Sequence, residues 1–242
     1  MRYEDLYNEW KNDPEKFWIN AAQNIDWIKF PSFALDSSNI PFYKWFPDGL
    51  VNTCYNAVDR HVIKGKGEKT AIIYDSAIRS VKEKITYSQL LERVTKFAHA
   101  MSNAGITKGD RVIIYMPMIP EAIVSMLACS RIGAIHSVVF GGFASNELAV
   151  RIDDAKPKAI IAGSCGIEPT GIIPYKPLLD KAIEQANHKP NFCVIFQRDE
   201  LQAPLVSNRD YDWYEFQKSS SECTCIPVFG NDPLYILYTS GT

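Results

Sequence analysis

The sequence has no run of the roughly 18 consecutive apolar residues that a membrane-spanning helix needs. It also lacks a charge excess, because 26 Lys and Arg residues stand against 28 Asp and Glu residues. Such a balance gives no basic surface for nucleic acid or anionic lipid. The N-terminus shows neither a secretory apolar core nor an Arg- and Ser-rich transit segment. We therefore expect a soluble cytoplasmic protein that binds neither nucleic acid nor membrane; a mitochondrial matrix location would need a more complete N-terminus in a eukaryotic protein.

Two common active-site motifs are absent as well. The sequence D-S-A-I at residues 75–78 follows the first predicted strand, where a dinucleotide-binding protein would carry G-x-G-x-x-G. None of the four His residues accompanies a Ser or Cys nucleophile in a recognisable elbow. We assign no catalytic residue, and a nucleotide-dependent oxidoreductase is the least favoured of the functions considered.

The six cysteines do not form a metal-binding pattern. Cys223 and Cys225 make a C-x-C pair in a Ser-rich stretch, but two thiolates need two further ligands to hold zinc. The other four stand singly among apolar residues, as small core side chains do in a reduced compartment: Cys54, Cys129, Cys165 and Cys193. The sequence thus predicts no metal site and no disulfide framework.

Short β-branched runs alternate with helical patterns from residue 71 onward. The predicted strands are 71–75, 111–116, 136–140, 159–162, 192–196 and 234–239. The predicted helices are 86–105, 120–132, 145–155 and 175–187. Thr86 and Gln89 form a capping box at the start of the first helix. This alternation predicts an α/β fold with a parallel βαβ sheet.

The first sixty residues are rich in aromatic side chains and show no strand rhythm. We expect residues 1–60 to form an extension whose aromatic rings pack on the α/β body, since aromatic rings bury large areas. A partner-binding arm is the alternative. Residues 202–231 are rich in Ser, Asp and Pro and predict a surface connection before the last strand.

Ligands bind at the carboxyl ends of the strands in a parallel sheet, so the turns after the strands are the candidate sites. The last predicted strand runs directly into T-S-G-T at residues 239–242, whose hydroxyls and backbone N–H groups suit phosphate oxygens. Gly141 and Gly142 separate another strand from a helix that Ser145 can cap. A third loop spans residues 163–171 on the same edge. Each of the first two turns has an ordinary structural alternative, a plain exit from a strand.

Several long segments together resemble AMP-forming acyl-CoA synthetases of the short-chain branch, the acetyl-CoA and propionyl-CoA synthetases. Y-T-S-G-T at 238–242 resembles the start of the family's phosphate loop, Y-T-S-G-[ST]-T-G-x-P-K-G. The other matching segments are P-F-Y-K-W-F at 41–46, N-T-C-Y-N-A-V-D-R-H at 52–61, G-D-R-V at 109–112, Y-M-P-M-I-P-E at 115–121, A-C-S-R-I-G-A-I-H at 128–136 and F-G-G-F at 140–143. G-I-E-P at 166–169 is more similar to the propionyl-CoA side.

The resemblance implies a two-step ligase that uses ATP, with Mg as its counter-ion, and CoA. ATP and acetate or propionate give an acyl-adenylate and pyrophosphate, and the CoA thiol then takes the acyl group. The family pattern implies ATP phosphate contacts at Thr239, Ser240, Gly241 and Thr242. It implies CoA contacts at Phe140, Gly141, Gly142, Glu168, Pro169, Thr170 and Gly171.

Two of these positions depart from the family. The acetyl-CoA synthetase pattern is R-A-G-R, whose arginines face a CoA phosphate, whereas this chain carries Glu168 and Gly171 there. A carboxylate cannot pair with a phosphate, so we expect that salt bridge to be missing.

The resemblance implies that residues 61–242 are the first part of the adenylation domain, cut inside the phosphate loop. The phosphate-loop Lys, the adenine and acyl pockets and the C-terminal domain lie, in the family, beyond residue 242. We expect the 242-residue polypeptide to be inactive alone, and its end inside a loop to be an unusual place for a natural terminus. A non-catalytic module that binds CoA or a partner is the alternative, and the sequence encoded after Thr242 separates the two.

Overall fold

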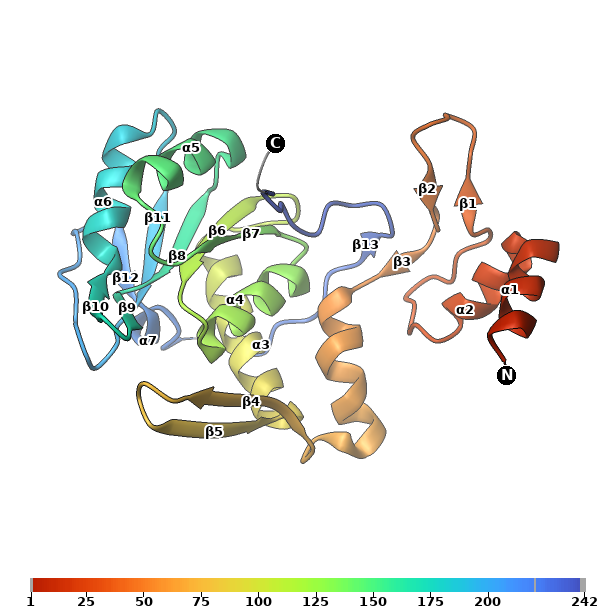
Figure 1. Cartoon of the computed structure of the whole chain (residues 1–242), viewed down its shortest axis with the longest axis horizontal. Helices are drawn as coiled ribbons and strands as arrows, with labels where there is room; N and C mark the ends of the chain where they lie inside the picture. The colour runs from red at the N-terminus through yellow and green to blue at the C-terminus, as the bar shows by residue number, and fades with distance from the viewer. Residues whose placement is uncertain (1, 220, 240–242) are drawn as a thin grey trace.

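The computed structural model describes residues 2–219 and 221–239, and its central element is a five-stranded sheet (Figure 1). The strand order is β12-β11-β8-β6-β7, and each neighbouring pair is parallel. The strands are β6 (Arg111–Met116), β7 (Ile135–Phe140), β8 (Ala159–Gly163), β11 (Phe192–Phe196) and β12 (Asp210–Asp212). The parallel α/β prediction is confirmed.

Helices cover both faces of this sheet. One face packs against α3 (Tyr87–Asn103), α4 (Pro120–Arg131) and the short α7 (Trp213–Phe216). The other packs against α5 (Ser145–Ala155) and α6 (Tyr175–Gln185). Residues of β8 are buried throughout, which explains its continuous apolar sequence. No described helix is both long and apolar enough to cross a membrane.

One predicted strand lies outside the parallel sheet, and another is not formed. Residues 71–75 lie in β4 (Thr70–Ser76), which pairs antiparallel with β5 (Val81–Thr86) outside the parallel sheet. Ile73 is exposed there, so its apolar run does not reflect burial on two faces. The described residues from 234 to 239 form no strand, because only Tyr235 makes a bridge to β7.

Several elements carry too few residues to be predicted. A hairpin, β9 (Cys165–Glu168) and β10 (Gly171–Pro174), occupies the third predicted loop. The predicted surface connection contains β12, α7 and β13 (Val228–Phe229). The last of these pairs with β3 (Leu50–Val51), joining the connection to the N-terminal region.

The N-terminal region forms a separate lobe at the side of the sheet (Figure 1). It contains α1 (Tyr3–Asn12), α2 (Pro14–Ala22), β1 (Leu35–Asp36) and β2 (Lys44–Trp45). Two π-helical segments, η1 (Tyr55–Asp59) and η2 (Val62–Lys66), lead from this lobe to β4.

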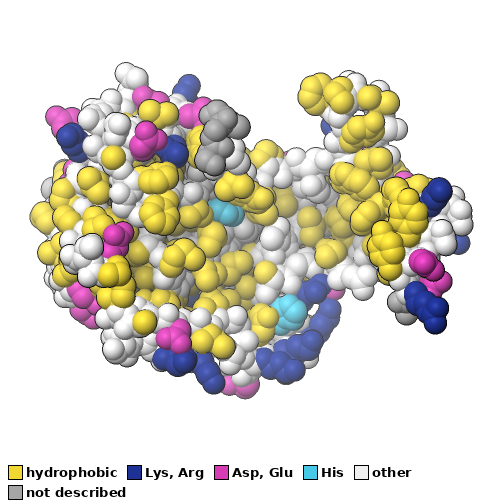
Figure 2. Space-filling model, in the orientation of Figure 1, with side chains coloured by type: hydrophobic (Ala, Val, Ile, Leu, Met, Phe, Trp, Pro, Cys, Tyr) yellow, Lys and Arg dark blue, Asp and Glu magenta, His cyan; other side chains and the backbone are white. Residues whose placement is uncertain are grey.

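Several aromatic side chains of the lobe pack on one another. The Trp18 and Trp45 rings meet edge to face at 5.3 Å, and Trp27 lies 5.5 Å from Phe46. Figure 2 shows apolar side chains gathered over this lobe. Polar bonds link the lobe to the rest of the chain, such as the Asn231 side chain that donates to the Trp45 carbonyl at 2.8 Å. The expectation that the aromatic rings pack on the α/β body stays a prediction.

Candidate functional site at the carboxyl edge of the sheet

The chain reverses its direction across the sheet at β6. From β6 it crosses to β7 on one side and then returns to β8 on the other side. Such a switch point opens a crevice at the carboxyl ends of the strands. The turns here are tightly packed, since a Cβ on Gly163 would lie 3.1 Å from Pro117 Cδ. The predicted CoA-binding segments begin at this edge.

Tyr175, at the start of α6, lies between two of these turns. A Cβ on Gly141 would lie 2.6 Å from Tyr175 Cε2 and 2.9 Å from the Met116 carbonyl oxygen. A Cβ on Gly166 would lie 2.5 Å from Tyr175 Cζ. Residues 141–144, between β7 and α5, form a turn that we call the β7 turn. The absence of side chains at both glycines therefore lets the tyrosine ring fit between the β7 turn and the β9–β10 hairpin.

A second tyrosine, Tyr115 of β6, forms a hydrogen bond with the β7 turn. The Tyr115 hydroxyl donates to the Phe143 carbonyl at 2.9 Å, and its ring lies 5.2 Å from that of Tyr175. Burial raises the pKa of Tyr115 to about 12 and also raises the pKa of Tyr175. Both phenols are therefore neutral near pH 7, and Tyr115 serves as a hydrogen-bond donor.

The predicted CoA-binding residues of the β7 turn face outward in part. Phe140 is 65% exposed, and its ring lies 5.6 Å from Phe143. Gly142 has a φ of +97°, which side chains other than glycine rarely adopt. The turn thus presents an aromatic ring beside backbone that is free of side chains.

The other predicted CoA-binding residues form the tip of the β9–β10 hairpin. Pro169 and Thr170 are its two loop residues, and Glu168 pairs with Gly171 across it. Glu168 is exposed. Burial raises the pKa of Tyr175, and the negative charge of Glu168 raises it further. Gly171 has a φ of +136°, so an arginine at this position would strain the backbone.

The segment that leads to the predicted phosphate loop starts beside β7. The Ile236 amide donates to the His136 carbonyl at 2.9 Å, and the segment then turns to α5. There the Tyr238 hydroxyl donates to Asp154 Oδ2 at 2.6 Å. This bond places Tyr238 beside α5 rather than along β7.

Arg151 connects this segment to the β7 turn. Its guanidinium carbon lies 4.9 Å from the Phe143 ring centroid and 5.2 Å from that of Tyr238. Thr239 therefore comes directly after Tyr238, whose ring contacts the same Arg151 guanidinium as the Phe143 ring of the β7 turn. The predicted phosphate-binding residues Ser240, Gly241 and Thr242 lie outside the described residues.

Sequence reasoning identified the turns but missed the side chains that organise them. Arg151 and Tyr175 stand inside predicted helices where nothing marks them out, and Tyr115 was noted only as the first residue of a family-like segment. The available signal was the set of glycines, because a glycine beside a strand end indicates that a backbone or a ring approaches closely.

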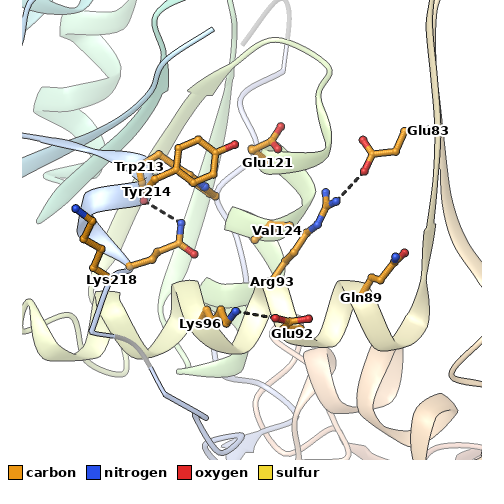
Figure 3. Close-up of a pocket in the computed structure, with 11 residues that line it drawn as sticks. Glu83, Gln89, Glu92, Arg93, Lys96, Glu121, Val124, Trp213, Tyr214 and Lys218 are labelled. Atoms are coloured by element: carbon orange, nitrogen blue, oxygen red, sulfur yellow. Dashed lines mark hydrogen bonds and ion pairs between the residues drawn. The ribbon is translucent and has the colours of Figure 1, made fainter. Parts of the chain in front are cut away.

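A separate cleft of about 860 Å³ lies between α3, α4 and α7 (Figure 3). Two of its cations are already paired, Arg93 with Glu83 at 2.7 Å and Lys96 with Glu92 at 2.6 Å. Burial raises the pKa of Glu121 in its wall. Since these charges pair among themselves, we assign this cleft no part in the proposed reaction.

The sequence model of the AMP-binding enzyme family matches residues 59–242. The chain belongs to this family. A second model, described as the acetyl-coenzyme A synthetase N-terminus, matches residues 3–57. The two matches cover the α/β body and the N-terminal lobe.

Several curated relatives are similar to this chain over nearly its whole length. The human mitochondrial acyl-CoA synthetase short-chain family member 3 is 50% identical over 231 residues, which is 95% of this chain and 34% of that protein. Propionate–CoA ligase of Escherichia coli K12 is 43% identical, covering 100% of this chain and 39% of that protein. The chain thus spans about a third of the length of these relatives.

The fold is similar to that of a solved structure. Acetoacetyl-CoA synthetase from Streptomyces lividans superposes with a TM-score of 0.84 and 19% identity, covering 96% of this chain and 35% of that one. At this identity the likeness establishes the fold of the described part.

Proposed function

We propose that this chain forms the front part of an AMP-forming short-chain carboxylate–CoA ligase, which joins propionate or acetate to CoA through an acyl-adenylate. In this proposal ATP, with Mg as its counter-ion, and CoA are the co-substrates. The observation that carries it is the meeting of the β7 turn and the β9–β10 hairpin around Tyr175, at the carboxyl edge of the sheet. The family membership and the names of the relatives agree with it.

The β7 turn is proposed as the surface along which CoA lies. The exposed Phe140 ring offers an apolar contact, and the glycines beside it let a ligand approach the backbone. Backbone N–H groups at Gly141 and Gly142 would serve as donors to a polar chain. Phe140, Gly141 and Gly142 thus keep the role that the family resemblance gives them.

The β9–β10 hairpin is proposed as the contact to the nucleotide end of CoA, with a weaker hold on phosphate. Glu168 would repel a phosphate, and Gly171 has no side chain with which to bind one. The positive φ of Gly171 favours glycine, so only the Glu168 position can take an arginine without backbone strain. Pro169 and Thr170 would then position the loop rather than supply charge.

The test measures binding of CoA and of 3′-dephospho-CoA to the 242-residue chain by titration calorimetry. Glu168→Arg removes a repulsion and adds a cation, so CoA should bind at least about fivefold more tightly, in line with about 1 kcal/mol for an exposed ion pair. Dephospho-CoA should gain less. Glu184→Arg is the matched control, because it reverses an exposed charge in the last turn of α6.

Equal gains for both ligands, or the same gain in the Glu184→Arg control, would contradict the placement of the phosphate. A folded chain that binds no CoA would instead favour the alternative, a module that binds a protein partner. We also expect no pyrophosphate release from ATP, propionate and CoA with this chain alone. Turnover in that assay would overturn the view that the remaining length is required.

A further inference from the structure

A buried polar cluster lies where the N-terminal lobe meets the body. Arg131 of α4 donates from Nη1 to Asp59 Oδ2 at 2.8 Å and from Nη2 to Asp59 Oδ1 at 2.9 Å. Its Nη1 also lies 3.5 Å from Cys54 Sγ. The Cys225 sulfur lies 3.9 Å from Asp59 Oδ2. The two sulfurs and the carboxylate all lie within 4.8 Å of one another.

Hydrogen bonds to three backbone carbonyls hold the segments around this cluster together. The Asn52 side chain donates to the carbonyls of Ser130, Arg131 and Ile226 at 2.9–3.1 Å. The Ile226 amide donates to the Arg131 carbonyl at 2.8 Å. The connection that carries Cys225 is therefore fixed beside η1, and the proximity of the two cysteines results from these bonds.

The cluster suits a thiol pair better than a metal ion. Both oxygens of Asp59 accept hydrogen bonds from the Arg131 guanidinium. A cation bound to the two thiolates and Asp59 would displace those bonds and face a fixed positive charge. The same guanidinium favours a thiolate at Cys54.

We propose that Cys54 and Cys225 are a redox modification site, which hydrogen peroxide converts to a disulfide. The Cys54 thiolate attacks one peroxide oxygen, the O–O bond breaks, and the second oxygen leaves as water after taking a proton. The Cys225 sulfur then attacks the Cys54 sulfenic acid, forming the S–S bond and releasing a second water that carries the Cys225 proton. Two thiols are oxidised by two electrons, and one peroxide is reduced to two waters.

The charges around the pair support this division of roles. A hydrogen bond from the Cys225 thiol to the Cys54 sulfur lowers the pKa of Cys54, and the Arg131 guanidinium lowers it further. The same bond and burial raise the pKa of Cys225, which keeps its proton. Cys54 is fully buried, whereas Cys225 is half-buried and lines a cleft of about 570 Å³, so a small peroxide would approach the pair from the Cys225 side.

The remaining cysteines provide internal controls. Burial raises the pKa of Cys129 and of Cys193 to about 12, so these two thiols react slowly. Cys223 is half-buried like Cys225 and stands two residues before it, but its sulfur hydrogen bonds to the Thr224 carbonyl instead. A reaction governed by exposure alone would therefore oxidise Cys223 as readily as Cys225.

The experiment treats the full 242-residue chain with hydrogen peroxide and maps its tryptic peptides without reduction. Trypsin places Cys54 in residues 45–60, and both Cys223 and Cys225 in residues 219–242. The expected product joins these two peptides with the loss of two hydrogens, and dithiothreitol separates them again. Cys223→Ser should give the same linked product.

Cys225→Ser should give no linked product and should leave a Cys54 sulfenic acid that dimedone traps. Three results would overturn the proposal: no linked peptide in the wild-type chain, a linkage through Cys223, or equal oxidation of Cys129. Fragment ions that divide the linked wild-type peptide at Thr224 tell a linkage through Cys225 from one through Cys223, so a variant that folds poorly does not leave the question open.

Discussion

The α/β body and the N-terminal lobe use their apolar residues in different ways. Helix α3 of the body buries seven residues, whereas α1 of the lobe buries none. Phe97 in the body is fully buried and stacks on Trp213 at 4.0 Å, while Tyr3 in the lobe is 78% exposed. Both regions are rich in apolar side chains, so composition alone does not show which of them forms a core.

The difference lies in what each helix packs against. The body helices cover a sheet of strands whose side chains point to both faces, so every turn finds an apolar partner. The lobe has only two-residue strands and pairs of rings. Its ring contacts organise the lobe locally, and the body should carry most of the free energy of unfolding.

The largest expected effect comes from removing a stacked ring in the body. Phe97→Ala should lower the free energy of unfolding by about 3–5 kcal/mol, because it leaves a cavity beside Trp213. Tyr3→Ala in the lobe should stay within about 0.5 kcal/mol of the wild type. Urea unfolding followed by far-UV circular dichroism measures both. Similar losses in the two variants would contradict the claim that the body carries most of the free energy of unfolding.

A smaller effect should come from a buried histidine at the start of β7. Burial lowers the pKa of His136 to about 4, and its Nδ1 has no hydrogen-bond partner. The unfolded chain binds this proton near pH 6.5 and the folded chain only near pH 4, so stability falls as pH falls between these values. The expected loss is about 2–3 kcal/mol by pH 4.

His136→Phe keeps a ring beside Tyr235 and removes the titrating group. Its unfolding free energy should therefore depend less on pH between 6.5 and 4 than that of the wild type, with the two profiles parallel above pH 7. Urea midpoints measured across this range provide the check. Parallel profiles over the whole range would show that His136 is protonated in the folded chain.

The smallest effect compares helix caps in the two regions. Thr86 accepts from the Gln89 amide at the start of α3, and Asp13 accepts from the Lys16 amide at the start of α2. Thr86→Ala should cost about 1 kcal/mol in the unfolding of the body. Asp13→Ala should leave that transition unchanged and speed amide hydrogen exchange within α2. A shift of the body transition by Asp13→Ala would show that lobe and body unfold together.

The sheet could be predicted where burial and chain order agree. Four of the five sheet strands, β6, β7, β8 and β11, follow from apolar runs separated by helices, and the Thr86–Gln89 capping box was found as predicted. The run at 71–75 misled, because a hairpin with one face toward a helix can carry the same residues as a buried strand. Periodicity over five residues does not separate these two cases.

The candidate site could be predicted only as turns. The glycines at 141, 142 and 171 mark backbone that needs space or positive φ, and both features are visible in a sequence. The ring that joins the turns comes from the start of another helix, so its place depends on how α6 crosses the sheet. The Cys54–Cys225 pair was missed for the same reason, since its members come from opposite ends of the chain.

The packing of Tyr175 against two glycines limits the order in which this part of the chain can change during evolution. A side chain at residue 166 would collide with the ring alone, so that replacement becomes acceptable only after residue 175 has become smaller. A side chain at residue 141 would also meet the Met116 carbonyl oxygen, so a smaller residue 175 would not make room for it. Residues 166 and 175 should therefore change together among homologues, whereas residue 141 should stay glycine.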